Sequence, residues 1–168
     1  MSTGARRGGR GVVIALAALA VAGATGCKRE KQLAGVDRWN VKHTRLKDAT
    51  GRCTPTDFPD GRSGMWCFGQ QPIGIKGMAV DIDLYFAGTA PETPIAELQL
   101  KVRACNEDKI LEWMRQNWGA PYQDNGKVFL WRNDNMRIAG FIPDEPASCL
   151  LRMYPPAEQA AFERAANK

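Results

Sequence analysis

The chain lacks most of the residues that metal and catalytic sites require. His43 is the only histidine, it has no partner at ligand spacing, and no C-x-x-C pair occurs. These absences argue against the common zinc sites and against a thioredoxin-type redox centre. There is no G-x-S-x-G motif, and residues 72–77 lack the spacing of a phosphate loop. We therefore expect no metal and no cofactor.

A basic surface is also lacking. The net charge is +5, from 23 Lys and Arg against 18 Asp and Glu. Three of the basic residues lie in the first 26 positions, so 20 basic and 18 acidic residues follow, a net charge of +2. The only later basic cluster is at residues 28–31. A nucleic-acid partner would need a basic stripe, so we expect none.

The first 27 residues have the layout of an export signal. A basic start without acidic residues precedes the apolar run 12–22, and the small residues 23–26 lead into Cys27. Such a segment is a targeting signal and not part of the fold. It resembles the lipobox of secreted bacterial lipoproteins, in which cleavage frees a cysteine that carries lipid. The resemblance implies a signal peptide over residues 1–26, lipidation of Cys27 and attachment to a cell-envelope membrane. Lys28, in place of Asp, favours the outer membrane facing the periplasm by the same resemblance.

Two other interpretations of this segment remain open. Residues 20–22 and 22–24 both fit the A-x-A pattern of ordinary signal cleavage, which would release a soluble protein. In the second interpretation the segment stays uncleaved as a membrane anchor, although the apolar run is shorter than the roughly 20 residues that span a bilayer. The cysteine count favours the lipoprotein. Five is an odd number, and lipid on Cys27 leaves four cysteines to pair.

Those four cysteines predict two disulfides, because export places them in an oxidising compartment. Three connectivities are possible, and the sequence alone does not decide among them. We favour Cys53–Cys67, which closes a turn-rich loop, and Cys105–Cys149, which ties the start of a helix to a late strand. The chain-entropy model gives stabilisations of about 3 and about 4 kcal/mol for these loops.

Residues 27–36 are polar and aperiodic and predict a tether, and residues 37–168 predict a single disulfide-stabilised domain. Apolar and polar residues alternate over 80–86 and over 98–102, with turn residues at 88–94 between them, which predicts an antiparallel hairpin. Three later strands, at 127–132, 136–142 and 149–154, are separated by turn residues and predict a meander.

Residues 106–118 predict the main helix. Asn106 is a good N-cap, Gly119 and Pro121 end the helix, and an apolar stripe runs along one side of it. A short Ala-rich helix is expected over 157–166. The order of elements predicts an α+β fold, with an antiparallel sheet, one main helix packed on a face and a short C-terminal helix.

Asp81 and Asp83 are the first candidate site. They share a strand face and lie about 6.5–7 Å apart by strand geometry, a separation that suits acid–base chemistry on a glycoside. The alternative is a solvated, salt-bridged face, since the hairpin register brings Lys101 and Arg103 to the same side.

Phe129 and Trp131 are the second candidate. They share one face of their strand, and Val128 and Leu130 share the other. If Val128 and Leu130 face the core, the two rings form an exposed aromatic patch that marks a binding surface. If both faces of the sheet are covered, all four are core residues.

No catalytic constellation is visible, and the signal is that of a lipoprotein. We therefore expect a non-enzymatic, lipid-anchored envelope protein that contacts the membrane through Cys27 and binds a partner protein or envelope component. One alternative is a periplasmic hydrolase or carbohydrate-active enzyme that uses Asp81 and Asp83. The other is a small-ligand binding module that uses Phe129 and Trp131.

Overall fold

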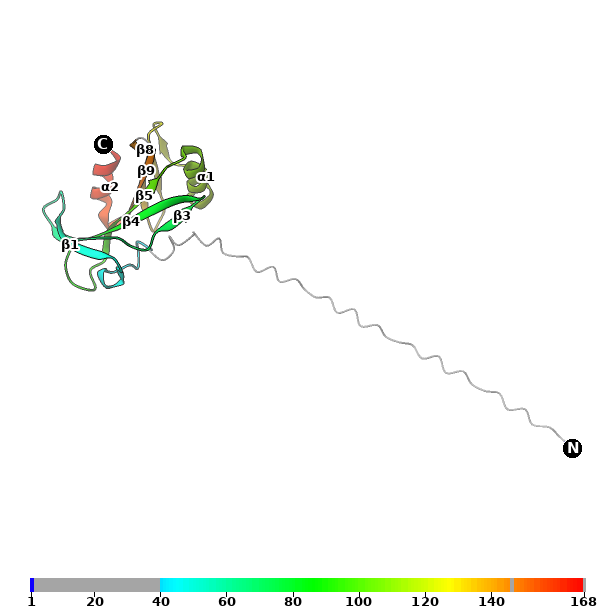
Figure 1. The fold of residues 1–168 in the computed structure, drawn as a ribbon, viewed down its shortest axis with the longest axis horizontal. Coiled ribbons are helices and arrows are strands. Elements are labelled where there is room, and N and C mark those ends of the chain that lie inside the picture. The colour runs from blue at the N-terminus through cyan, green and yellow to red at the C-terminus, as the bar shows by residue number, and fades with distance from the viewer. Residues whose placement is uncertain (2–39, 146, 168) are drawn as a thin grey trace. The chain divides into compact units, whose positions relative to one another are not determined.

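The computed structural model describes Met1 and residues 40–145 and 147–167. Apart from Met1, the predicted signal peptide, the lipidation site Cys27 and the tether 27–36 lie outside these residues. The described residues from 40 onward belong to one compact unit, Lys31–Lys168. They form an α+β fold, in which a mostly antiparallel sheet is accompanied by helices of 12 and 8 residues (Figure 1). Neither described helix is long and apolar enough to cross a membrane.

The described part of the chain contains nine strands in one sheet, in the order β1-β2-β4-β5-β9-β8-β7-β6, with β3 paired to β4. Every pairing is antiparallel. The pairing of β5 with β9 joins the first half of the sheet to the second. The strands are β1 (Arg52–Asp57), β2 (Ser63–Phe68), β3 (Ile73–Ile75), β4 (Met78–Phe86), β5 (Ile95–Arg103), β6 (Gln123–Asp124), β7 (Val128–Arg132), β8 (Arg137–Glu145) and β9 (Ser148–Tyr154).

The helix α1 (Glu107–Trp118) covers the first face of the sheet. The Asn106 side chain accepts a hydrogen bond from the backbone N–H of Lys109 at 3.0 Å and so caps the helix. Ile110, Trp113 and Met114 of α1 are buried in one large core cluster. That cluster also contains the alternate apolar residues of the central strands, which are Val80, Ile82, Leu84, Leu98, Leu100, Val102, Leu151 and Met153.

The helix α2 (Gln159–Ala166), which follows the short 3-10 helix η3 (Pro156–Glu158), covers part of the second face. Phe162 and Ala165 of α2 form a separate buried cluster with Leu130, Ala139 and Tyr154. Because successive side chains of a strand point to opposite faces, this cluster lies on the other side of the sheet from α1. The rest of the second face carries the polar residues of β4, β5 and β9.

Two disulfides join Cys53 to Cys67 and Cys105 to Cys149, which confirms the predicted disulfide bonds. The first links residues that face each other across β1 and β2. The second links the residue before the cap of α1 to β9. The first disulfide therefore fastens the edge strand β1 to its neighbour β2, and the second fastens the start of α1 to the central strand β9.

Candidate functional site

The two carboxylates proposed for acid–base chemistry are held in ion pairs. Lys101 Nζ lies 2.6 Å from Asp83 Oδ2, and Arg103 Nη2 lies 2.6 Å from Asp81 Oδ1. Both bridges cross from β5 to β4. Asp83 is buried, with 7% of its side chain exposed, whereas its lysine partner is 47% exposed. This geometry matches the salt-bridged strand face and offers no unpaired carboxylate for catalysis.

Phe129 and Trp131 do not form an exposed aromatic patch, and the structure matches the other alternative, in which they are core residues. The two residues are 4% and 2% exposed, and their ring centroids lie 6.1 Å apart. Trp131 Nε1 donates a hydrogen bond to the backbone oxygen of Gly119 at 3.0 Å, so the polar atom of the ring is satisfied. The physical reason is that both faces of β7 are covered. Phe129 and Trp131 pack in the cluster of α1, and Leu130 packs in that of α2.

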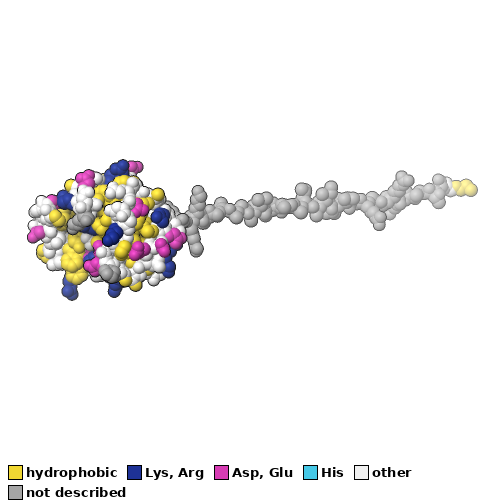
Figure 2. All heavy atoms as spheres, turned by 90° about the horizontal axis from the view of Figure 1, so that it is seen from above, with side chains coloured by type: hydrophobic (Ala, Val, Ile, Leu, Met, Phe, Trp, Pro, Cys, Tyr) yellow, Lys and Arg dark blue, Asp and Glu magenta, His cyan; other side chains and the backbone are white. Residues whose placement is uncertain are grey.

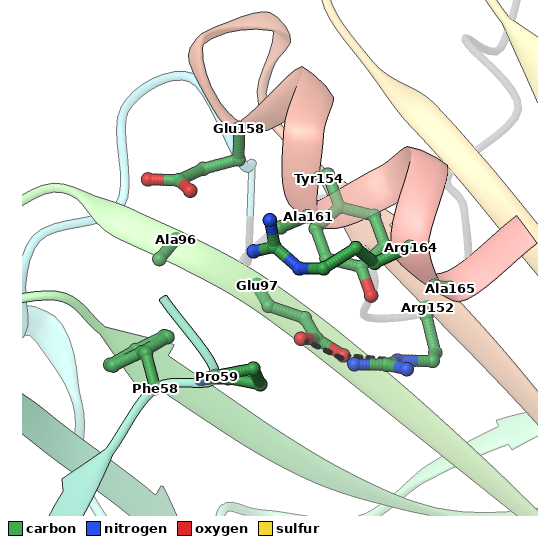
Figure 3. A pocket seen from close by; sticks show the side chains of 10 residues that line it. All are labelled: Phe58, Pro59, Ala96, Glu97, Arg152, Tyr154, Glu158, Ala161, Arg164 and Ala165. Atoms are coloured by element: carbon green, nitrogen blue, oxygen red, sulfur yellow. Dashed lines mark hydrogen bonds and ion pairs between the residues drawn. The ribbon is translucent and has the colours of Figure 1, made fainter. Parts of the chain in front are cut away.

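The structure instead contains a cavity between the second face and α2. Its volume is about 190 Å³, and it is lined by β5, β9, η3, α2 and the turn between β1 and β2 (Figure 3). Phe58 and Pro59 of that turn form one wall, and Ala161 and Ala165 of α2 form another. We call this space the α2 cavity.

Glu97 and Arg152 form the floor of the α2 cavity. Arg152 Nε lies 2.5 Å from Glu97 Oε1, and Arg152 Nη2 lies 2.8 Å from Oε2, a two-pronged pairing (Figure 3). Gln99 Nε2 donates a further hydrogen bond to Glu97 Oε1 at 2.7 Å. Burial acts to lower the pKa of Arg152, but the hydrogen bond and charge of Glu97 outweigh it, so that pKa is raised. Arg152 therefore stays charged.

Tyr154 contributes an unsatisfied polar atom to the α2 cavity. The residue is 0% exposed, and its hydroxyl makes no hydrogen bond of normal geometry among the described residues, although it lies close enough to Glu97 and Arg152 for both to affect its pKa. Burial raises the pKa of this hydroxyl, so it keeps its proton. Its ring packs against Phe162 at 6.1 Å between centroids. In Figure 3 the hydroxyl points toward the Glu97–Arg152 pair.

Two other side chains of the described residues share this property. Trp66 Nε1 and Gln70 Nε2 are also buried without a hydrogen-bond partner. They line a second hollow, of about 320 Å³, which also borders Asp81, Asp83 and Lys101 and so opens on the second face. Unsatisfied buried polar groups are rare in native proteins, and each calls for an explanation. Here all three line hollows on the same face.

An arginine clamp holds the turn 58–62 over the α2 cavity. Arg62 Nη1 and Nη2 donate to the two carboxylate oxygens of Glu158 at 2.8 and 2.6 Å, and Nη2 donates to Asp60 Oδ2 at 2.8 Å. The hydrogen bonds that Arg62 donates to Glu158 and then to Asp60 raise the pKa of Arg62. The clamp thus joins the β1–β2 turn to the residue that precedes α2.

Arg164 is held less tightly. It lies in the last turn of α2, is 45% exposed, and has Nη2 at 3.5 Å from Asp60 Oδ2. Asp60 already accepts hydrogen bonds from Nε, Nη2 and the backbone N–H of Arg62. In Figure 3 the Arg164 side chain reaches from α2 across the ring of Tyr154. Arg164 therefore retains hydrogen-bond donors that its contacts with the described residues do not use.

The lining of the α2 cavity has hydrogen-bond donors, two carboxylates, small apolar groups and two aromatic rings, those of Phe58 and Tyr154. These groups can hold a ligand by hydrogen bonds and apolar contact. Among the described residues, no three His, Cys, Asp or Glu side chains are grouped so as to hold a metal ion. In the view of Figure 2, positive and negative side chains are interspersed, so no large region of one sign surrounds the domain on that face.

Comparison of the chain with protein-family models, with curated proteins and with solved structures finds no match. The α2 cavity and the signal-like segment are therefore the features from which a function is inferred.

Proposed function

We propose that this protein is a non-enzymatic binding module of the bacterial cell envelope. It is anchored by lipid on Cys27, on the outer membrane facing the periplasm, and it takes a group of a partner protein or envelope component into the α2 cavity. The sequence supports the anchor, through the lipobox resemblance and the odd cysteine count. The geometry of the α2 cavity supports the binding.

The observation that carries the binding function is the hydroxyl of Tyr154. A buried hydroxyl without a partner costs about 1–3 kcal/mol, which is a large fraction of the stability of a small domain. Phenylalanine would fill the same space without that cost. A tyrosine here is explained if a bound group completes its hydrogen bonding. Functional sites are where such local costs are found.

Site-specific photocrosslinking in living bacteria tests this proposal. A photoreactive amino acid replaces Ala161, which lines the α2 cavity and is partly exposed. The control carries the same amino acid at Gln116, which is exposed on α1. We expect a crosslinked species from position 161 that is absent from position 116.

Two outcomes contradict the proposal. In the first, position 161 gives no adduct in cells that hold the full-length protein in the envelope. In the second, both positions give the same adducts in the same yield, which is the behaviour of a surface without a site. The Ala161 variant must also show both disulfides by non-reducing mass mapping, so that a folding defect is distinguished from an empty site.

A further inference from the structure

We infer that the α2 cavity binds a carboxylate attached to a small apolar group, as in an amino acid or the end of a peptide chain. This inference rests on the proposed binding function and names the chemistry of the ligand. Three features carry it: the hydrogen-bond donors of the α2 cavity, the state of its acidic residues, and its size and apolar walls.

The free hydrogen-bonding capacity of the α2 cavity is on the donor side. The Tyr154 hydroxyl is buried beside the Glu97–Arg152 pair without a hydrogen bond of normal geometry, and Tyr154 lines the α2 cavity. Within residues 40–145 and 147–167, the ion-pair contact of Arg164 is the 3.5 Å approach of Nη2 to Asp60 Oδ2. Arg152 uses Nε and Nη2 for Glu97, so Nη1 is the remaining nitrogen of its guanidinium. Arginine and hydroxyl donors match the two oxygens of a carboxylate in geometry and in charge.

The acidic residues around the α2 cavity are already engaged. Glu97 accepts from Arg152 and Gln99, and both oxygens of Glu158 accept from Arg62. Asp60 likewise accepts from Arg62 through three of its N–H groups. A carboxylate that enters the α2 cavity therefore meets acidic residues that are already paired with arginines. It also meets Arg164, whose contact with Asp60 is long, at 3.5 Å. Each of these acids already pairs with an arginine, so a cationic ligand would gain less from them than from unpaired carboxylates.

The walls and size of the α2 cavity limit what can be attached to the carboxylate. The methyl groups of Ala161 and Ala165 and the side chains of Phe58 and Pro59 offer apolar contact. The volume of about 190 Å³ is close to that of an apolar cavity of about 150 Å³ that holds benzene, and below the roughly 300–1,000 Å³ of sites for drug-sized ligands. One small residue fits, and the rest of a longer ligand would lie outside.

Two sources could supply this chemistry: a free amino acid, or the carboxyl end of a peptide. Both present a carboxylate next to a small side chain. They differ in the neighbouring nitrogen, which is a charged ammonium in the first and a neutral amide in the second. The probes below separate them.

The test is a binding titration followed by NMR on the full-length lipoprotein in detergent micelles. The signals of the arginine Nε–Hε groups report on Arg152 and Arg164 directly. The probes are N-acetyl-alanine, its neutral amide, free alanine and N-acetyl-trialanine. We expect saturable shifts with N-acetyl-alanine and at least tenfold weaker binding of the amide. If free alanine binds more tightly than the other probes, the ligand is a free amino acid. If N-acetyl-trialanine binds most tightly, the ligand is the carboxyl end of a peptide.

Matched variants locate the binding. Arg164→Gln and Tyr154→Phe are each expected to weaken N-acetyl-alanine about tenfold. Arg115→Gln, which changes the basic residue in the last turn of α1, is expected to leave the affinity unchanged. Absence of saturable shifts, equal binding of acid and amide, or an unchanged affinity in Arg164→Gln would overturn the inference. If crosslinking at Ala161 still succeeds in that case, the binding function stands and only the ligand class is wrong.

Discussion

Replacement of Tyr154 by phenylalanine is expected to stabilise the ligand-free protein. The side chain is fully buried and its hydroxyl has no partner among the described residues, so the wild type bears the desolvation cost of that group. This cost is about 1–3 kcal/mol. The ring contact with Phe162 is unchanged in phenylalanine, so no cavity is created. We take the lower end, a gain of about 1 kcal/mol, which corresponds to a rise in Tm of about 4 °C for a domain of this size.

The assay is urea unfolding of the wild type, Tyr154→Phe and Tyr122→Phe at pH 7. Tyr122 is 47% exposed, so loss of its hydroxyl should change the free energy of unfolding by less than about 0.5 kcal/mol. A loss of 1 kcal/mol or more in Tyr154→Phe would refute the reasoning, because it would mean that the hydroxyl is satisfied in the free protein. A gain in stability together with weaker carboxylate binding would identify Tyr154 as a residue kept for binding.

Three further predictions concern the floor of the α2 cavity, alkaline pH and a disulfide. Arg152→Met should lower the free energy of unfolding by about 3 kcal/mol, because Glu97 would keep a buried charge with only a neutral donor, Gln99. Adding Glu97→Gln to this variant should restore part of the loss. Strict additivity of the two substitutions in urea unfolding would argue against coupling between the two residues. Burial, followed by nearby acidic charge, raises the pKa of Tyr85 from 10.0 to about 12. The unfolded state therefore loses this proton first, and stability falls between about pH 10 and pH 12, by up to about 1.4 kcal/mol per pH unit. Tyr85→Phe should reduce that slope in unfolding curves, and an identical slope would contradict the assignment. Conversion of both Cys105 and Cys149 to serine should cost about 4 kcal/mol by the chain-entropy model, and an unchanged urea midpoint would show that this disulfide is not formed.

Local patterns in the sequence were sufficient to predict those helices and strands whose pattern does not depend on their neighbours in the fold. The alternation in β4 and β5 is visible because each buries one face, and the cap at Asn106 marks the start of α1. The strand β1 was not predicted, because Pro55 lies within it and its burial pattern is weak. Proline is tolerated there because β1 is at the edge of the sheet.

The α2 cavity could not be predicted, because it depends on which strands are neighbours. Arg152 and Tyr154 alternate with apolar residues of β9, so the sequence can place them on one face. Glu97, the partner of Arg152, lies 55 residues from it, and only the pairing of β5 with β9 brings the two together. The two alternatives left open at Phe129 and Trp131 have the same origin. An isolated strand does not reveal that helices cover both of its faces.

The central claim is that a lipid on Cys27 anchors this binding domain in the envelope. Mass spectrometry of the mature N-terminus, on protein purified from bacterial membranes, tests it most directly. The account predicts a chain that begins at Cys27 and carries the added mass of lipid, and a Cys27→Ser variant without that modification. Cleavage before Gly23 or Thr25, with an unmodified Cys27, would contradict it.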